Sequence, residues 1–270
     1  MIDTLNRTAR HTAKKTHDIL TRAMAAAGWA ESPAKLARDA QEYWRSAGDE
    51  RWKSRSHWRD ATVFAGNDLW TETGKRHIEL FDRLSRVCDR PARTATTLEW
   101  GCGGGANAVA FAPRSERFIG VEISEQSLEE CRRQVEATCD ASFVPVLIDG
   151  DRPENVLDEI EPGSVDLFVS FYVFELITSQ EYGARLLRIA RALLADDGLA
   201  LVQIKYDIGS FRTGPRRRGY RRGMEDMTTY RIDAFWALTE ACGLRPELVH
   251  LVPENELDGR YAYFLLSRRT

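Results

Sequence analysis

The sequence has little cysteine, no long apolar run and no excess of positive charge. Only 5 of its 270 residues are cysteine, and none of them forms a C-x-x-C pair, so neither a disulfide framework nor a zinc site is predicted. No stretch approaches the roughly 18 apolar residues that cross a membrane, and the first twenty residues lack the apolar segment of a secretion signal. Because 41 acidic residues offset 38 basic ones, the chain is not a polycation. We therefore expect a cytoplasmic protein with no membrane partner, and we predict no metal-ligating residues.

The N-terminal third of the chain has a helical pattern. Apolar residues recur at helical spacing from Thr12 to Trp44, with a break at Ser32-Pro33, and again from about Thr73 to Arg86. No strand pattern occurs before Thr96. This change in pattern divides the chain into an N-terminal helical extension or lid (residues 1–90) and a core (residues 91–270).

From Thr96 onward, predicted strands alternate with predicted helices, which is the pattern of a parallel sheet covered on both faces. The last two strands are joined by a short turn and so form an antiparallel pair. The sequence therefore predicts an α/β, Rossmann-like doubly wound fold, whose mostly parallel seven-stranded sheet ends in an antiparallel strand. The predicted strands are 96–100, 117–123, 142–148, 164–174, 199–206, 244–252 and 261–267.

The strongest local signal is a glycine-rich turn between the first strand and a helix. A ligand that touches backbone at such a turn requires residues without a Cβ. The dinucleotide-binding pattern is met by Gly101-x-Gly103-x-x-Ala106, with Glu122 about twenty residues on. An NAD(P)-dependent oxidoreductase is therefore one interpretation. Glu99 favours another ligand, because an acid repels a pyrophosphate but suits the cationic methionine end of S-adenosylmethionine.

At these residues the chain resembles the class I (Rossmann-like) S-adenosylmethionine-dependent methyltransferases, over roughly residues 96–267. The resemblance implies that the loop from Glu99 to Gly105 wraps the methionine part and that Glu122 holds both ribose hydroxyls. It also implies that Asp149 or Asp151 reaches the adenine amino group; the sequence does not choose between them. The implied cofactor-binding residues are Trp70, Glu99, Gly101, Cys102, Gly103, Gly105, Glu122, Ile123, Asp149, Gly150, Asp151, Ser170 and Phe171.

Methylation of a hydroxyl requires a group that removes its proton. His57 and His77 lie in the extension that can fold over the cofactor, and Tyr172 and Glu175 lie near the carboxyl end of a strand, where ligands of open α/β sheets bind. We predict His77, Tyr172 and Glu175 as the candidate catalytic residues. His250, inside a strand, is interpreted as a packed histidine.

The arginine-rich segment from Arg212 to Arg231 follows the fifth predicted strand. Its charge suits an anionic or sugar-rich acceptor, or alternatively belongs to a solvated loop. We predict acceptor contacts from Arg216, Arg217, Arg218 and Tyr220. The net negative charge of the chain argues against a nucleic acid as partner.

The predicted function is methylation of a small polar acceptor, by O-methylation of a sugar or natural-product hydroxyl. A looser resemblance to bacterial methyltransferases of sugar and natural-product pathways favours the same function. Methylation of RNA or protein is the alternative within the same chemistry. A nicotinamide-dependent oxidoreductase and a non-catalytic scaffold are the alternatives of other classes.

Overall fold

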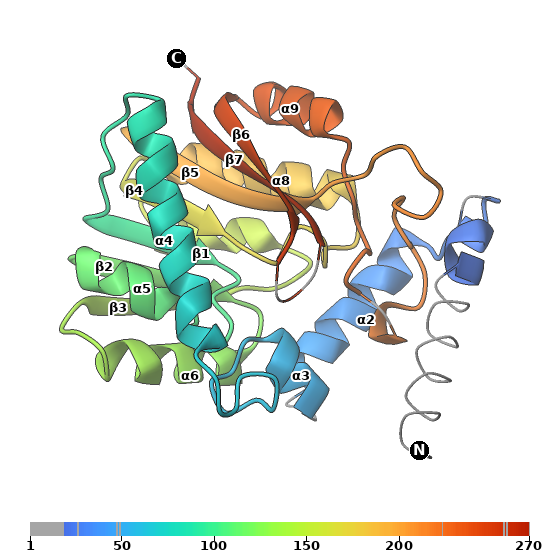
Figure 1. The fold of residues 1–270 in the computed structure, drawn as a ribbon, viewed down its shortest axis with the longest axis horizontal. Coiled ribbons are helices and arrows are strands. Elements are labelled where there is room, and N and C mark those ends of the chain that lie inside the picture. The colour runs from blue at the N-terminus through green and yellow to red at the C-terminus, as the bar shows by residue number, and fades with distance from the viewer. Residues whose placement is uncertain are drawn as a thin grey trace.

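The computed structural model describes residues 19–25, 27–46, 48, 50–222, 224–255, 257 and 259–269. Its centre is a seven-stranded sheet with the order β3-β2-β1-β4-β5-β7-β6 (Figure 1). The strands are β1 (Thr96–Trp100), β2 (Arg117–Glu122), β3 (Ser142–Leu147), β4 (Val165–Ser170), β5 (Leu194–Lys205), β6 (Leu244–Glu254) and β7 (Gly259–Arg268).

The pairing of the strands confirms the predicted fold class. β1 to β5 pair in parallel, whereas β7 runs antiparallel to both of its neighbours, β5 and β6. A dinucleotide-binding fold instead continues with a parallel sixth strand beside the fifth. The inserted antiparallel strand therefore separates this sheet from that of a nicotinamide-dependent oxidoreductase.

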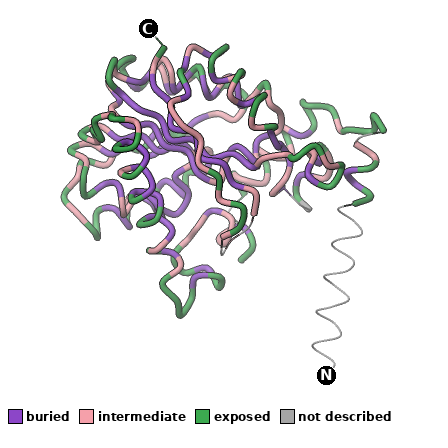
Figure 2. Tube along the Cα trace, turned by 45° about the horizontal axis from the view of Figure 1, so that its top comes forward, coloured by how far each residue is buried: buried purple, intermediate pink, exposed green. Residues whose placement is uncertain are grey.

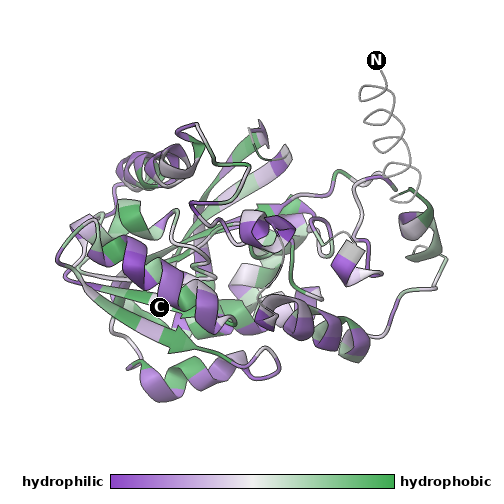
Figure 3. Cartoon of the chain, turned by 90° about the horizontal axis from the view of Figure 1, so that it is seen from below, coloured by the Kyte–Doolittle hydropathy of each residue, from purple (hydrophilic) through white to green (hydrophobic). Residues whose placement is uncertain are grey.

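Helices cover both faces of the sheet, and the buried residues follow the strands between them (Figure 2). Coloured by hydropathy, the strands are largely apolar and the outer helix surfaces largely polar (Figure 3). One face carries α4 (Leu69–Val87), α5 (Ala108–Phe111) and α6 (Glu125–Glu136); the other carries α7 (Val156–Glu159), α8 (Gln180–Leu193) and α9 (Ile232–Ala241). α4 packs into the same core as the sheet, since Phe81 and Phe118 belong to one apolar cluster.

Alternation along β1 decides where its acidic residue points. Leu98 and Trp100 belong to the apolar cluster that contains Leu187 of α8. Successive side chains of a strand face opposite sides of the sheet. Glu99 therefore faces α4 and α5, and its side chain is hydrogen-bonded to Asn107.

Two helices of the N-terminal region lie beyond the carboxyl ends of the parallel strands (Figure 1). They are α2 (Pro33–Arg45) and α3 (Glu50–Arg55). The Ser32 side chain accepts from the N–H of Lys35, and Pro33 occupies the first helical position, so the predicted break at Ser32-Pro33 is a helix start. The part of the predicted helix before Ile19 lies outside the described residues.

The arginine-rich segment packs against these helices. Asp226 pairs with Arg22, Lys205 and Arg260, and Arg55 of α3 pairs with Glu225 at 2.7 Å. The segment is thus part of the structure that holds the N-terminal helices over the sheet.

Two predicted boundaries in the second half of the sheet are wrong. The fourth strand was predicted to run to Phe174 but ends at Ser170, because Tyr172 has a φ of 57° and turns the chain away. The fifth strand was predicted to begin at residue 199, but β5 starts at Leu194 and passes through a register shift opposite Val165 and Leu167.

Several classes of site are absent from the part of the chain that the structure describes. It contains no helix that is long and apolar enough to span a bilayer and no group of three His, Cys, Asp or Glu residues arranged to hold a metal ion. All five cysteines are free thiols.

Candidate functional site

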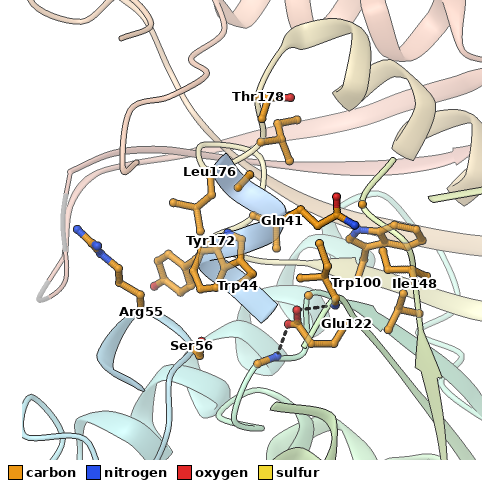
Figure 4. Close-up of a pocket in the computed structure, with 18 of the residues that line it drawn as sticks. Gln41, Trp44, Arg55, Ser56, Trp100, Glu122, Ile148, Tyr172, Leu176 and Thr178 are labelled. Carbon is orange, nitrogen blue, oxygen red and sulfur yellow. Dashed lines mark hydrogen bonds between the residues drawn. The ribbon is translucent and has the colours of Figure 1, made fainter. Parts of the chain in front are cut away.

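A cavity opens at the carboxyl ends of β1, β2 and β4, beneath α2 (Figure 4). One part of its wall comes from the glycine loop and the strand ends, and another comes from α2, the 55–57 turn and the segment after β4. The wall is formed by Ala37, Ala40, Gln41, Trp44, Arg55, Ser56, His57, Trp100, Gly101, Gly103, Val121, Glu122, Ile123, Ile148, Gly150, Phe171, Tyr172, Val173, Leu176, Ile177, Thr178, Tyr182 and Tyr220.

The glycine loop is constrained both by its conformation and by its neighbours. Gly101, Gly103 and Gly105 all have positive φ, at 77°, 50° and 91°, a region that residues with a Cβ rarely adopt. A Cβ on Gly103 would lie 2.4 Å from the carbonyl oxygen of Ser56. The loop therefore needs glycine in part because the 54–58 turn packs directly on its backbone.

Glu122 lies at the end of β2 with its carboxylate at the cavity wall. Its Oε1 accepts from the N–H of Ile123 at 2.7 Å and its Oε2 from the N–H of Gly103 at 3.1 Å. Burial raises the pKa of this carboxyl, while the backbone donors oppose that rise. A carboxylate has about four lone-pair sites, so Glu122 can still accept two hydrogen bonds from adjacent hydroxyls of a ribose.

Glu99 lies behind the glycine loop rather than in the cavity wall. Its Oε1 accepts from Asn107 Nδ2 at 2.9 Å, and its buried Oε2 has no hydrogen-bond partner among the described residues. Desolvation raises the pKa of Glu99 to about 8. An orphaned buried carboxyl beside the loop fits a cofactor that brings positive charge, as the ammonium and sulfonium groups of S-adenosylmethionine do.

His77 is embedded behind the same loop. Its Nδ1 is 2.7 Å from Asn107 Oδ1 and its Nε2 is 3.0 Å from the Tyr263 hydroxyl, and its ring stacks on Phe171 at 4.0 Å. Burial lowers the pKa of His77 to about 4, so the imidazole is neutral at pH 7. His77 therefore lies outside the cavity wall. It connects Asn107, which is hydrogen-bonded to Glu99, with Tyr263 of β7.

The other two candidate catalytic residues, Tyr172 and Glu175, both follow β4, but only Tyr172 lines the cavity. Tyr172 lines the cavity; its N–H donates to Gln203 Oε1 at 2.6 Å, and its hydroxyl accepts from Asn255. Glu175 is buried and accepts from the hydroxyl of Tyr261 at 3.4 Å. The structure brings Tyr172 to the site, whereas Glu175 lies outside the cavity wall.

At the end of β3, Gly150 lines the cavity and the two flanking acids do not. Asp149 accepts from Gln41 of α2 at 3.0 Å and from the N–H of Asp151, and Asp151 is exposed. Asp149 therefore helps to hold α2 across this end of the cavity, and Gln41 supplies the polar side chain of the wall there.

The remaining predicted residues divide into wall and support. Gly101, Gly103, Ile123, Phe171 and Tyr220 lie in the wall. Residues outside the wall are Trp70, whose Nε1 donates to the carbonyl of His57; Cys102, Gly105 and Ser170; and Arg216, Arg217 and Arg218. The side chain of Arg218 donates to the carbonyl of Trp29, and the carbonyl of Arg217 accepts from Glu31. Arg217 and Arg218 thus contact the N-terminal region, and none of the three arginines lines the cavity.

The predicted site did not include most of the wall that covers the cavity. Gln41 and Trp44 of α2 face the cavity with Leu176 from the segment after β4, and Arg55 and Ser56 also line it (Figure 4). The i, i+3, i+4 spacing of Ala37, Ala40, Gln41 and Trp44 was a signal for a buried helix face, but the sequence did not show what that face covers.

Comparisons with known proteins agree with this geometry. Residues 98–200 match the sequence model of a family described as a methyltransferase domain, a range that includes the glycine loop, Glu122 and the turn after β4. No curated protein matches the chain in sequence.

Solved structures share the fold at low sequence identity. A SAM-dependent methyltransferase from Leishmania major is 14% identical, with 87% of this chain and 85% of that chain covered and a TM-score of 0.59. The 1,6-didemethyltoxoflavin-N1-methyltransferase of Burkholderia thailandensis, with bound 1,6-didemethyltoxoflavin and S-adenosylhomocysteine, is 15% identical, with coverage of 89% and 92% and a TM-score of 0.59. An S-adenosylmethionine-dependent methyltransferase from Clostridium acetobutylicum is 12% identical, with coverage of 78% and 96% and a TM-score of 0.55.

Proposed function

We infer that this chain is an S-adenosylmethionine-dependent methyltransferase with a Rossmann-like domain. We further infer that it methylates a hydroxyl group of a small, flat and largely apolar acceptor. The cofactor supplies a methyl group on a sulfonium. The chain's own residues bind the cofactor, align the acceptor with it and exclude water.

The cofactor part of this assignment rests on the carboxyl ends of β1 to β3. Glu122 presents its carboxylate to the cavity, Ile123 and Ile148 offer apolar surface beside it, and Gly101 and Gly103 allow close approach of the backbone. These are the groups that a ribose, an adenine and a methionine chain need.

The nature of the remaining wall supports an apolar acceptor. Trp44 and Tyr220, joined by a 2.8 Å hydrogen bond between Nε1 and the hydroxyl, lie with Leu176 and Val173 on the side of the cavity closed by α2. A sugar with several hydroxyls needs several polar partners, because a buried polar group without a partner costs about 1–3 kcal/mol. This part of the wall favours a planar ring that carries one hydroxyl over a sugar.

The covering helix also supports a small acceptor rather than RNA or protein. α2 is tied down on two sides, by Gln41 to Asp149 and by Trp44 to Tyr220. Two arginines of the segment that suggested a basic binding surface, Arg218 and Arg221, are engaged with Trp29 and Glu42 of this N-terminal region. A macromolecule would reach the cavity only after α2 had moved away.

The experiment measures release of S-adenosylhomocysteine from S-adenosylmethionine with a panel of acceptors: methyl glucoside, 7-hydroxy-4-methylcoumarin and bulk tRNA. We expect turnover with the planar hydroxyl compound and none with the sugar or tRNA, and the Glu122→Gln variant should need about 5–30-fold more S-adenosylmethionine to reach the same rate. Turnover confined to methyl glucoside or tRNA contradicts the proposed acceptor class.

A further inference from the structure

We propose that His57 is the group that takes the proton from the acceptor hydroxyl as the methyl is transferred. This inference rests on the proposed function, because it needs an acceptor that loses a proton. It assigns a role to a cavity-lining imidazole that is distinct from the embedded His77.

His57 is held directly against the cofactor loop. The carbonyl of Ser56 accepts from the N–H of Gly104 at 2.6 Å, and a Cβ on Gly104 would lie 2.7 Å from the carbonyl oxygen of His57. The imidazole itself lines the cavity and meets the ring of Tyr172 edge to face at 4.9 Å. It thus lies between the loop that binds the methionine part and the turn that follows β4.

The backbone at His57 is in a conformation that its surroundings must maintain. Its φ is 51°, a left-handed value that residues with a Cβ rarely adopt. Trp70 Nε1 donates to its carbonyl at 2.7 Å, and Phe64 packs edge to face on its ring at 5.7 Å. Such strain, stabilised by several contacts, is concentrated at functional sites.

The imidazole of His57 is available as a proton acceptor. Among the described residues no hydrogen bond engages either of its ring nitrogens, in contrast to His77, whose two nitrogens are both engaged. Burial lowers the pKa of His57 to about 4, so at pH 7 the ring is neutral and one nitrogen carries a lone pair.

The transfer balances with His57 in this role. The acceptor oxygen forms a bond to the methyl carbon, and the C–S bond breaks with its electron pair remaining on sulfur. The O–H proton passes to the lone pair of His57, which leaves a methyl ether, S-adenosylhomocysteine and an imidazolium that later releases its proton to water. Since the sulfonium charge disappears in the same step, the imidazolium does not face a second cation on the cofactor.

The test compares two nucleophiles on one ring system. 2-Naphthol is still almost entirely protonated at pH 8 and must lose a proton to be methylated, whereas 2-naphthalenethiol is already largely a thiolate at that pH. His57→Asn is suitable because asparagine tolerates positive φ. We expect it to slow methylation of the hydroxyl probe by about 10²–10⁴-fold and to change methylation of the thiolate by no more than about threefold. The control variant His250→Asn should affect neither.

Equal losses with both probes, or no loss with the hydroxyl probe, overturn the role of His57. A second measurement does not depend on turnover: ring ¹⁵N resonances of histidine are recorded in the S-adenosylhomocysteine complex before and after addition of 2-naphthol. The proposal expects the His57 signal to shift, and an unmoved signal overturns it. Failure of S-adenosylhomocysteine to bind, measured by calorimetry, instead overturns the proposed function.

Discussion

The backbone N–H of Gly103 donates a 3.1 Å hydrogen bond to the carboxylate of Glu122. This bond joins the loop after β1 to the end of β2. Because the same carboxylate faces the cavity, we expect the conformation of the glycine loop and the recognition of a ribose to depend on one side chain.

Glu122→Gln should weaken binding of S-adenosylhomocysteine by about 5–30-fold. A charged acceptor contributes about 1.5–3 kcal/mol per hydrogen bond and a neutral one about 0.5–1.5, so the amide loses about 1–2 kcal/mol. Calorimetric titration checks this, with the exposed Glu125→Gln as the matched control. Equal affinities of the Glu122 variant and the wild type would show that Glu122 does not bind the ribose.

Gly103→Ala should both destabilise the fold and abolish cofactor binding, since its Cβ would lie 2.4 Å from the Ser56 carbonyl. Gly66 is the matched control: it has a similar positive φ of 71° but no atom within 4 Å of an added Cβ. Gly66→Ala should cost only the conformational term of about 1–2 kcal/mol. Urea unfolding and calorimetry of S-adenosylhomocysteine measure both effects. If the two variants behave alike, the contact between the loop and the 54–58 turn has no energetic consequence.

Binding of S-adenosylhomocysteine at pH 7 should release about one proton from Glu99, because a carboxyl with a pKa of about 8 is mostly protonated at that pH and an arriving ammonium favours its ionised form. Calorimetry in two buffers of different ionisation enthalpy counts the proton. Glu99→Gln should abolish the release, and Glu125→Gln should retain it. If Glu99→Gln releases as many protons as the wild type, the proton comes from another group.

His77 should make stability depend on pH. Its pKa of about 4 in the folded protein lies below the ordinary value of 6.5, so the unfolded chain binds the proton more readily. The free energy of unfolding should therefore fall as the pH drops from about 6.5 to 4, by up to about 3 kcal/mol from this group. His77→Gln should unfold more easily at pH 7, because two buried hydrogen bonds change, and its stability should vary less over that range. Urea midpoints at several pH values, with His250→Gln as control, test this; a pH dependence identical to that of wild type counts against it.

Local patterns in the sequence predicted most of the fold. The alternation of strands and helices placed all seven strands, and the glycine spacing placed the turn that follows β1 at the cavity, because these signals depend on residues close in sequence. The end of β4 was misplaced because Phe171 to Phe174 continue an apolar run, and only the positive φ of Tyr172 turns the chain away.

The cavity cover depends on contacts between distant residues, which a single sequence does not reveal. Trp44 bonds to Tyr220, and Gln41 to Asp149. The glycines at 103 and 104 also accommodate the Ser56 and His57 backbone, a reason for glycine that the loop's own pattern does not contain.

The cavity beneath α2 is expected to bind S-adenosylmethionine. Titration of S-adenosylhomocysteine into the full chain, repeated in the presence of excess NAD⁺, measures this. We predict one S-adenosylhomocysteine bound per chain with an affinity that NAD⁺ does not change. Absence of binding, or displacement of S-adenosylhomocysteine by NAD⁺, would show that this cavity is not a site for S-adenosylmethionine.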